Sequence, residues 1–192
     1  MKWIQNMDTS FLLFLQEHVR VEGMNGFWKA ITSLGDRGWF WIGLTLVMIV
    51  IGFLFQNRSA IFYKIRQTGI AAAISMFIGA IVTNLFLKNW VARPRPYDAV
   101  KEIVPLIGRQ VDFSFPSGHT CAAFACALII YRMLPKRYGI PAIVLAVLIA
   151  FSRMYLGVHY PTDILGGFLV ALTSSYLAYH LVEGKQTLEE RL

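Results

Sequence analysis

Long apolar runs constrain the fold of this chain more than any other feature of its sequence. The run at 39–55, WFWIGLTLVMIVIGFLF, has no charged residue. A helix of roughly 20 residues crosses the hydrocarbon core of a bilayer, and lipid offers an open backbone no hydrogen-bond partners. Such runs therefore predict membrane-spanning helices. We count five of them, at 39–55, 68–87, 118–134, 140–151 (extending towards 157) and 163–182.

The composition also favours a membrane protein. Hydrophobic residues make up 56% of the 192 residues and charged residues 15%, whereas charged residues are roughly 25% of soluble domains. The runs at 118–134 and 140–151 are short, so we expect them to tilt little or to lie in a locally thinned bilayer. The length allows one domain. We therefore predict an all-α, polytopic membrane helix bundle of about five spans over residues 39–183, followed by a short polar tail at 184–192.

Residues 1–38 differ from the rest of the chain. The segment SFLLFLQEHV at 10–19 has too few apolar residues to cross a bilayer, and FWKAITSLGD at 27–36 is a second short amphipathic piece. We interpret both as interfacial helices, with a sixth, broken span as the alternative. Side-chain oxygens at 8–10 (Asp8, Thr9, Ser10) are typical of an N-cap, so the first helix is predicted to begin there.

Basic residues between the runs predict the orientation in the membrane. The loops predicted at 56–67 and 132–139 carry three cations each and no acidic residue. Because cytoplasmic loops are enriched in Lys and Arg, these loops are expected inside, and 88–117 and 152–162 outside. Loop 88–117 is also basic, and we expect some of its cations to be held there for another reason. We interpret the formal net charge of +7 as basic residues that mark loops and face anionic lipid, and not as a sign of nucleic-acid binding.

Three polar clusters occur at the ends of the predicted spans. They are KNWVARPRP at 88–96, FPSGHT at 115–120 and SRMYLGVHYPTD at 152–163. With five spans, all three reach the same face of the membrane. Residues that are far apart in the sequence can therefore converge at one end of the bundle.

These clusters contain the residue types that bind phosphate. Arginine forks match phosphate oxygens, and a lysine adds a compact charge. The PSG turn lies where a helix should begin, and the free N–H groups of a helix N-terminus favour an anion. The predicted phosphate-binding residues are Lys88, Arg95, Ser117, Gly118 and Arg153. Arg93 is a further candidate: it is left open between phosphate, a lipid head group and water, and we expect a contact.

The third cluster also supplies reactive groups. His159 and Asp163 are four residues apart, and Pro161 between them is tolerated if it opens a helix. Asp163 can then accept the proton of one imidazole nitrogen and leave the other free to attack. His119 can protonate the leaving oxygen. This pattern predicts phosphoryl transfer to water through a phosphohistidine. The histidines lack zinc-ligand spacing, so we predict no metal ion and no cofactor.

Together the motifs resemble those of the type 2 phosphatidic acid phosphatase family. Its KxxxxxxRP, PSGH and SRxxxxxHxxxD signatures match residues 88–96, 116–119 and 152–163 without a gap. The resemblance implies a metal-independent phosphatase with a six-helix core. It implies His159 as nucleophile, Asp163 as its partner and His119 as general acid. It assigns phosphate binding to Lys88, Arg95, Ser117, Gly118 and Arg153. The N-terminus departs from the family pattern because it contains no convincing extra span.

The leading hypothesis is an integral membrane lipid phosphatase that acts on a lipid (pyro)phosphate. The outer-face site favours undecaprenyl diphosphate and a place in the bacterial cytoplasmic membrane, and phosphatidic acid or phosphatidylglycerophosphate is the alternative substrate. A transporter is a second class, but the ionisable residues lie at span ends and not at the midplane that transport would need. A non-catalytic lipid-binding protein should have lost the nucleophile. The expected partners are the lipid phosphate and the bilayer, without nucleic acid, and the sequence leaves the oligomeric state open.

Overall fold

The computed structural model describes residues 2–189, and every regular element in that range is a helix. The bundle helices are joined to several short helical segments, of which η1 and η4 are π-helical and η2 and η3 are single 3₁₀ turns. The all-α prediction is confirmed. In chain order the elements are α1 (Lys2–Phe14), η1 (Leu15–Val19), η2 (Glu22–Met24), α2 (Asn25–Ser33), η3 (Asp36–Gly38), α3 (Trp39–Phe55), α4 (Ala60–Ala80), η4 (Ile81–Leu87), α5 (Lys88–Val91), α6 (Pro96–Ala99), α7 (Gly118–Met133), α8 (Lys136–Tyr155) and α9 (Pro161–Glu189).

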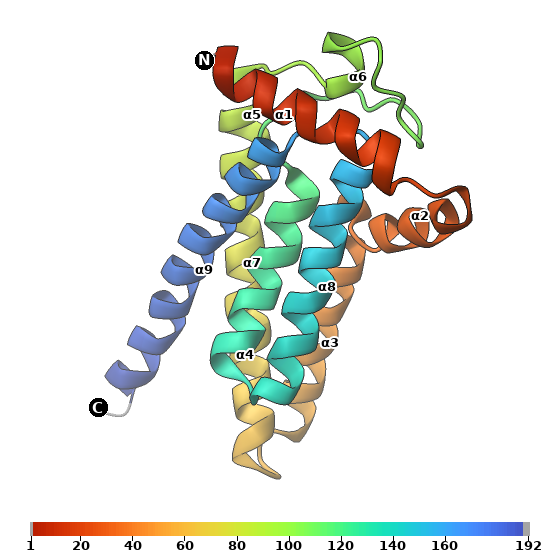
Figure 1. Cartoon of the computed structure of the whole chain (residues 1–192). Coiled ribbons are helices and arrows are strands. Elements are labelled where there is room, and N and C mark those ends of the chain that lie inside the picture. The colour runs from red at the N-terminus through yellow and green to blue at the C-terminus, as the bar shows by residue number, and fades with distance from the viewer. Residues whose placement is uncertain (1, 190–192) are drawn as a thin grey trace.

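Five of these helices form the bundle. α3, α4, α7, α8 and α9 run along its length, and α7 packs against α4, α8 and α9 (Figure 1). α1 lies across one end of the bundle, and α2 lies at the same end (Figure 1). The C-terminal part of α9 lies at the opposite end (Figure 1). The N-terminal helices α1 and α2 therefore cover one end of the bundle.

Four segments of the described chain contain a helix that is long and apolar enough to cross a membrane: Glu22–Phe55, Ala60–Ala99, Lys136–Tyr155 and Pro161–Glu183. α7 is also apolar but has only 16 residues. Because α7 is buried among the other helices, little of its surface has to match the thickness of the lipid. The protein is thus a multi-pass membrane protein, with the five predicted apolar runs in five packed helices.

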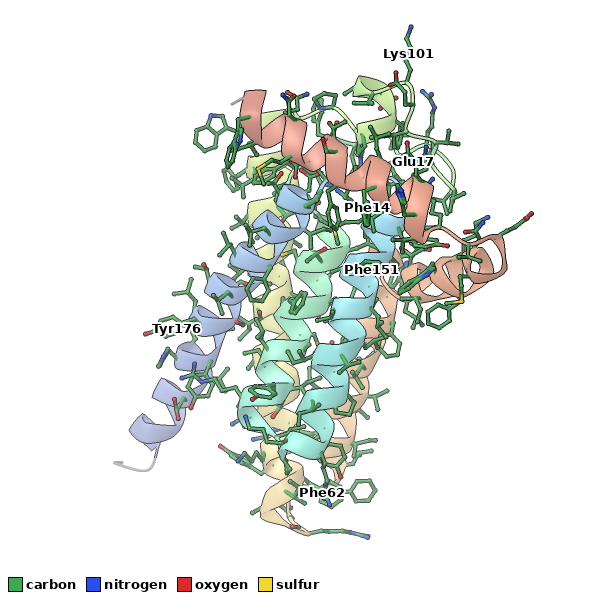
Figure 2. All side chains as sticks on the ribbon, viewed as in Figure 1. Phe14, Glu17, Phe62, Lys101, Phe151 and Tyr176 are labelled. Carbon is green, nitrogen blue, oxygen red and sulfur yellow. The ribbon has the colours of Figure 1, made fainter. Side chains whose placement is uncertain are left out.

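The outer surface of the bundle is apolar, as a lipid-facing surface requires. Large side chains project from it (Figure 2), including Tyr176 of α9, which is 56% exposed. Leu54 of α3 and Phe77 of α4 are each 67% exposed. In a water-soluble protein such a continuous apolar surface would favour aggregation. In a bilayer it replaces lipid–lipid contacts without loss.

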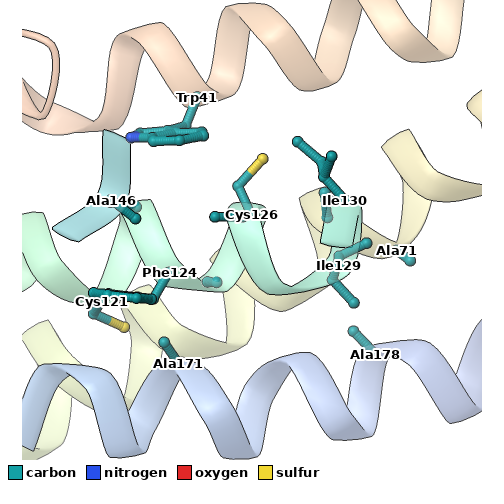
Figure 3. Packing of buried hydrophobic residues seen from close by; sticks show 14 of the residues in the cluster. Trp41, Ala71, Cys121, Phe124, Cys126, Ile129, Ile130, Ala146, Ala171 and Ala178 are labelled. Carbon is teal, nitrogen blue, oxygen red and sulfur yellow. The ribbon is translucent and has the colours of Figure 1, made fainter. Parts of the chain in front are cut away.

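The core depends on small residues that bring helices close together. Alanines at 71, 146, 171 and 178 from α4, α8 and α9 face α7, where Phe124, Ile129 and Ile130 fill the space between them (Figure 3). Close approach of this kind is how helices associate where no water drives them together. Cys121 and Cys126 point to different sides of α7 (Figure 3) and are free thiols, as their five-residue spacing predicts.

Several predicted loops are shorter than the sequence suggested, which corrects those predictions. Residues 60–67 of the loop predicted at 56–67 belong to α4, whose N-cap Ser59 accepts a hydrogen bond from the Ile61 N–H. α8 begins at Lys136, so the predicted loop 132–139 shrinks to two residues. Charged residues do not end these helices because a helix can continue past the hydrocarbon, where water and head groups solvate its side chains. α9 likewise continues into the predicted tail, to Glu189, and 190–192 lie outside the described residues.

The predicted N-cap at Asp8, Thr9 and Ser10 is wrong. α1 begins at Lys2, and these three residues lie inside it. The Asp8 carboxylate does not cap α1: it is buried, with an exposed fraction of 3%, and bonds to groups far along the chain. The physical reason is that a long-range partner outweighs the local cap.

Candidate active site

The three predicted clusters converge at the end of the bundle that α1 covers. Lys88 begins α5, Arg95 precedes α6, and Ser117 is the N-cap of α7. Arg153 lies in the last turn of α8, and Asp163 lies in the first turn of α9, which Pro161 opens as predicted. The Ser117 N–H donates to the Asp163 carbonyl at 3.0 Å, which ties the PSGH turn directly to α9.

His159 is buried in the turn between α8 and α9, with 1% of its surface exposed. Its Nε2 lies 2.9 Å from Nη1 of Arg95. Arginine can only donate, so Nε2 accepts and the proton of the neutral ring sits on Nδ1. Nδ1 lies 3.4 Å from Oδ2 of Asp163, which is long for a hydrogen bond, as catalytic contacts often are before substrate tightens them. The geometry thus presents the Nε2 lone pair on the Arg95 side and an acceptor behind Nδ1.

The surroundings of His159 keep its imidazole neutral. Burial lowers its pKa, and the positive charges of Arg95 and Arg153 lower it further, while the nearby Asp163 carboxylate opposes them. The net result is a pKa of about 3. A neutral imidazole is the form that can act as a nucleophile.

Asp163 accepts hydrogen bonds from several donors, in addition to its longer contact with His159. Its Oδ2 accepts from the Tyr160 N–H at 2.9 Å and from the Ser114 hydroxyl. Its Oδ1 accepts from Nη1 of Arg93 at 2.7 Å. The carboxylate is fully buried, with 0% exposed, so these bonds stabilise a charge that burial would otherwise disfavour.

Arg95 and Arg153 are the buried cations of the site. Arg95 donates to the Val158 carbonyl at 2.8 Å, and its Nη2 lies 2.5 Å from Oδ1 of Asp112. Arg153 donates from Nη1 to the Thr32 hydroxyl at 2.8 Å, which links it to α2. The Nε of Arg153 is buried and has no hydrogen-bond partner within residues 2–189. A buried donor of this kind can serve an anion that enters the site.

Asp112 was not singled out from the sequence. It lies in the loop before α7 and forms ion pairs with both Lys88 and Arg95. Partial burial would raise its pKa, but the hydrogen bonds and charges of these two residues outweigh that effect and lower the pKa to about 2. Asp112 therefore stays ionised and contacts the same cations that the motifs assign to phosphate. No local pattern in GRQVDFS marks this role.

His119 contacts a second carboxylate that the sequence did not reveal. Its Nε2 lies 3.0 Å from Oδ1 of Asp36 in η3, between α2 and α3. An ionised carboxylate only accepts, so this contact favours a proton on Nε2 of His119. The Gly118 Cα–H faces Lys88: a Cβ built there would lie 3.9 Å from Nζ of Lys88. The start of α7 thus brings an imidazole, a cation and helix N–H groups together.

Arg93, the further candidate for phosphate, contacts four protein groups. Its Nη2 lies 2.7 Å from Oδ2 of Asp8, and its Nη1 contacts both Asp163 and the Thr162 hydroxyl at 2.7 Å. Its guanidinium also lies 3.8 Å from the ring centroid of Tyr160. The predicted site residues therefore form one assembly, and Arg93 lies on its α1 side.

A cavity of about 890 Å³ borders this assembly on the side of Lys88 and the start of α7. Lys88, Asp112 and His119 line its polar end, and apolar residues of α3 and α4 such as Ile49 and Phe77 line its other walls. A cavity with a charged end and an apolar length fits a molecule that has a phosphate head and a hydrocarbon tail.

Comparisons with known proteins agree with this geometry. A family model described as the PAP2 superfamily matches residues 68–187. An undecaprenyl-diphosphatase from Sulfolobus acidocaldarius is 31% identical over 178 residues, which are 92% of this chain and 80% of that protein. A phosphatidylglycerophosphatase B from Bacillus subtilis is 34% identical over 176 residues, which are 86% of this chain and 77% of that protein.

The fold is shared with a solved structure as well. The crystal structure of a transmembrane PAP2-type phosphatidylglycerolphosphate phosphatase from Bacillus subtilis aligns with a TM-score of 0.77 and 28% identity, over 96% of this chain and 88% of that chain. The family resemblance read from the three motifs is confirmed. Since the family model spans α7, α8 and the site motifs, the protein belongs to the PAP2 superfamily and is a membrane lipid phosphatase.

Proposed function

We propose that the protein hydrolyses the terminal phosphate of undecaprenyl diphosphate or a closely similar polyprenyl diphosphate at the outer face of the cytoplasmic membrane. The observation that carries this proposal is the cavity whose polar end holds Lys88 and His119 and whose walls are apolar. The tail of the substrate stays between α3 and α4, and the phosphate meets the buried cations.

The reaction proceeds in two steps through a phosphohistidine. Nε2 of His159 attacks phosphorus, the bond from phosphorus to the leaving oxygen breaks, and His119 gives that oxygen a proton. Water then attacks the phosphohistidine and loses its proton to His119. The P–N bond breaks, inorganic phosphate is released, and His159 is restored. Asp163 stabilises the positive charge that the ring carries in between.

Lys88, Arg95 and Arg153, with the N–H groups that follow Ser117, hold the phosphate oxygens. Fixed cations and dipoles of this kind stabilise the charge of a phosphoryl transition state without reorganisation. In many other phosphotransfer enzymes a magnesium ion fills that role. We expect the reaction to need no metal.

The outer orientation rests on the distribution of charge. The basic residues at 56–67 and 132–139 lie at the end of the bundle opposite the site, since α4 and α8 start there and α7 ends there. The tendency of cytoplasmic ends to be positive puts the site outside. A cysteine in place of the fully exposed Val111 tests this, in a background where Cys121 and Cys126 are replaced by alanine. Labelling by an impermeant thiol reagent in intact cells supports the orientation, and labelling only after lysis contradicts it.

A glycerophospholipid phosphate is the second candidate, because the Bacillus subtilis relative and the similar crystal structure are both named as phosphatidylglycerophosphate phosphatases. Purified protein in detergent with EDTA should be compared on undecaprenyl diphosphate, phosphatidic acid and phosphatidylglycerophosphate, with His159→Ala as the blank. We expect the highest kcat/KM on the polyprenyl diphosphate. A higher value on either glycerophospholipid would favour the second candidate, and loss of activity in EDTA would overturn the metal-free mechanism.

A further inference from the structure

We infer that Asp8 of α1 is a positioning residue of the active site, which acts through Arg93 and Thr162 on Asp163 and so on the orientation of His159. The inference rests on the proposed role of His159 as nucleophile. It gives α1, which lies across the end of the bundle (Figure 1), a role in the site in addition to the membrane-surface role predicted from the sequence.

The first observation is the burial of Asp8. Only 3% of its surface is exposed, although it lies on a short helix with exposed apolar side chains such as Trp3, 72% exposed, and Phe14, 52% exposed. An amphipathic helix that only anchored a protein to lipid would present its acidic groups to water. A buried carboxylate needs specific partners to be tolerated.

Its partners all belong to the catalytic region. Oδ2 lies 2.7 Å from Nη2 of Arg93 and accepts from the Thr162 hydroxyl, and Oδ1 accepts from the Thr162 N–H at 3.1 Å. The Thr162 N–H is one of the free donors in the first turn of α9. Asp8 therefore acts as a cap for α9, supplied from a helix more than 150 residues earlier in the chain.

Arg93 links this contact to the His159–Asp163 pair, called the dyad below. Its two amino groups bridge the carboxylates of Asp8 and Asp163, each at 2.7 Å, and its guanidinium plane lies over the ring of Tyr160. With one end of the fork held by Asp8, the other end fixes Oδ1 of Asp163. That leaves Oδ2 of Asp163 aimed at Nδ1 of His159, 3.4 Å away.

The same arrangement sets the charge around His159. The groups that face its ring are Arg95, Arg153 and Asp163, and Arg93 lies behind Asp163. Asp8 supplies the negative charge that balances Arg93. Without it, Arg93 would neutralise more of the field of Asp163 at the imidazole, and protonation of His159 would become less favourable.

The test compares Asp8→Asn with Glu17→Gln, a matched loss of one negative charge. Glu17 lies in η1, directly after α1 (Figure 2), is exposed, and takes no part in the site. On whichever lipid phosphate the wild type hydrolyses best, Asp8→Asn should lower kcat by about 10- to 100-fold with KM nearly unchanged. Glu17→Gln should match the wild type in both.

A second readout separates positioning from a purely structural effect. In Asp8→Asn, the acid limb of the kcat/KM profile should move to lower pH by about half a unit, because Arg93 is no longer balanced. Asp8→Glu, which keeps the charge, should leave that limb in place and recover part of kcat. This variant also serves if Asp8→Asn proves too unstable to purify.

The outcomes are distinguishable. If the wild type turns over none of the lipid phosphates, the proposed function fails and Asp8 is not the cause. If the wild type is active and Asp8→Asn has the same kcat and the same pH profile as the wild type, the inference is overturned. If Asp8→Asn raises KM and leaves kcat intact, Arg93 binds substrate phosphate and Asp8 does not act on the dyad, which also overturns it.

Discussion

Nη1 of Arg95 lies 2.9 Å from Nε2 of His159, the nitrogen proposed to attack phosphorus. The contact joins two of the three motifs and fixes the tautomer of the ring. The guanidinium of Arg95 therefore both orients His159 and lies beside the proposed position of the phosphate. Arg95 reaches this place because Pro96, which follows it and opens α6, keeps the backbone of Arg95 itself extended.

Arg95→Lys should therefore be a severe substitution although it keeps the charge. Lysine cannot reproduce a planar fork that contacts Val158, Asp112 and His159 at once. We expect kcat/KM to fall by about 100-fold or more, with a folded protein by thermal melting. Arg109→Lys is the control, since Arg109 lies 72% exposed in the same loop and contacts Asp98 and the ring of Tyr97, away from His159. A similar loss in both variants would contradict a special role for Arg95.

Asp112→Asn should strengthen the binding of phosphate. The carboxylate contacts Lys88 and Arg95, so an incoming phosphate has to compete with it. Its pKa of about 2 means that it competes at every working pH. We expect the inhibition constant of inorganic phosphate to fall by about 3- to 10-fold, whereas Asp98→Asn leaves it unchanged. Weaker inhibition in Asp112→Asn would instead show that the carboxylate holds the two cations in place.

The neutral state of His159 can be measured directly. Burial, together with Arg95 and Arg153, lowers its pKa to about 3, against an ordinary value of about 6.5. Protonation would remove the lone pair with which His159 attacks. The unprotonated imidazole should therefore persist as the pH falls through 6.5 and be lost only near pH 3. Protein with labelled histidine should show a ring signal, absent in His159→Gln, that stays neutral at pH 5. A signal that titrates near 6.5 would contradict this.

The same depressed pKa has a consequence for folding. In the unfolded chain His159 binds a proton below about pH 6.5, whereas in the folded protein it does not until near pH 3. Its contribution to stability is therefore complete above 6.5 and is lost as the pH falls towards 3. The His159→Gln variant should lose less stability than the wild type over that interval.

How far the sequence predicts this site depends on where each residue lies relative to a motif. Lys88, Ser117 and Arg153 were predicted because hydropathy places the ends of the spans, and span ends meet at one face. Asp36 and Asp112 were missed because nothing near them in sequence resembles a site. Their partners are 83 and 17 or 24 residues away.

The fold shows the same limit. The apolar run at 39–55 coincides with α3 because its composition decides both burial in lipid and helix formation. The start of α4 at Ala60 was missed, since hydropathy reports the hydrocarbon boundary and not the end of the helix. The capping pattern predicts Asp8 as a cap of its own helix, because a local pattern cannot reveal that its carboxylate caps α9 instead.

Substitutions at Asp36 should depend on the leaving group. Its carboxylate lies 3.0 Å from Nε2 of His119, the proposed general acid. The leaving group of a polyprenyl diphosphate is a lipid monophosphate, which needs little protonation. The leaving group of phosphatidic acid is a glycerol alkoxide, which needs full protonation. We expect Asp36→Asn to lower kcat on phosphatidic acid by about 10- to 100-fold and on a polyprenyl diphosphate by much less. Equal losses on the two substrates would show that Asp36 does not act through the acid.

Close packing between α9 and the PSGH turn should be essential to the site. A Cβ on Gly167 would lie 2.5 Å from the backbone carbonyl oxygen of Ser117, a contact that only a shift of the backbone can relieve. Gly167→Ala should therefore push α9, and Asp163 with it, away from the start of α7. We expect a loss of about 1–3 kcal/mol in stability and a fall in kcat.

Gly43→Ala on α3 is the matched control, because a Cβ there meets nothing within 4 Å. It should keep full activity and the wild-type melting temperature or a slightly higher one. If Gly167→Ala behaved like Gly43→Ala, the turn and α9 would not be packed as tightly as the Ser117–Asp163 hydrogen bond of 3.0 Å requires.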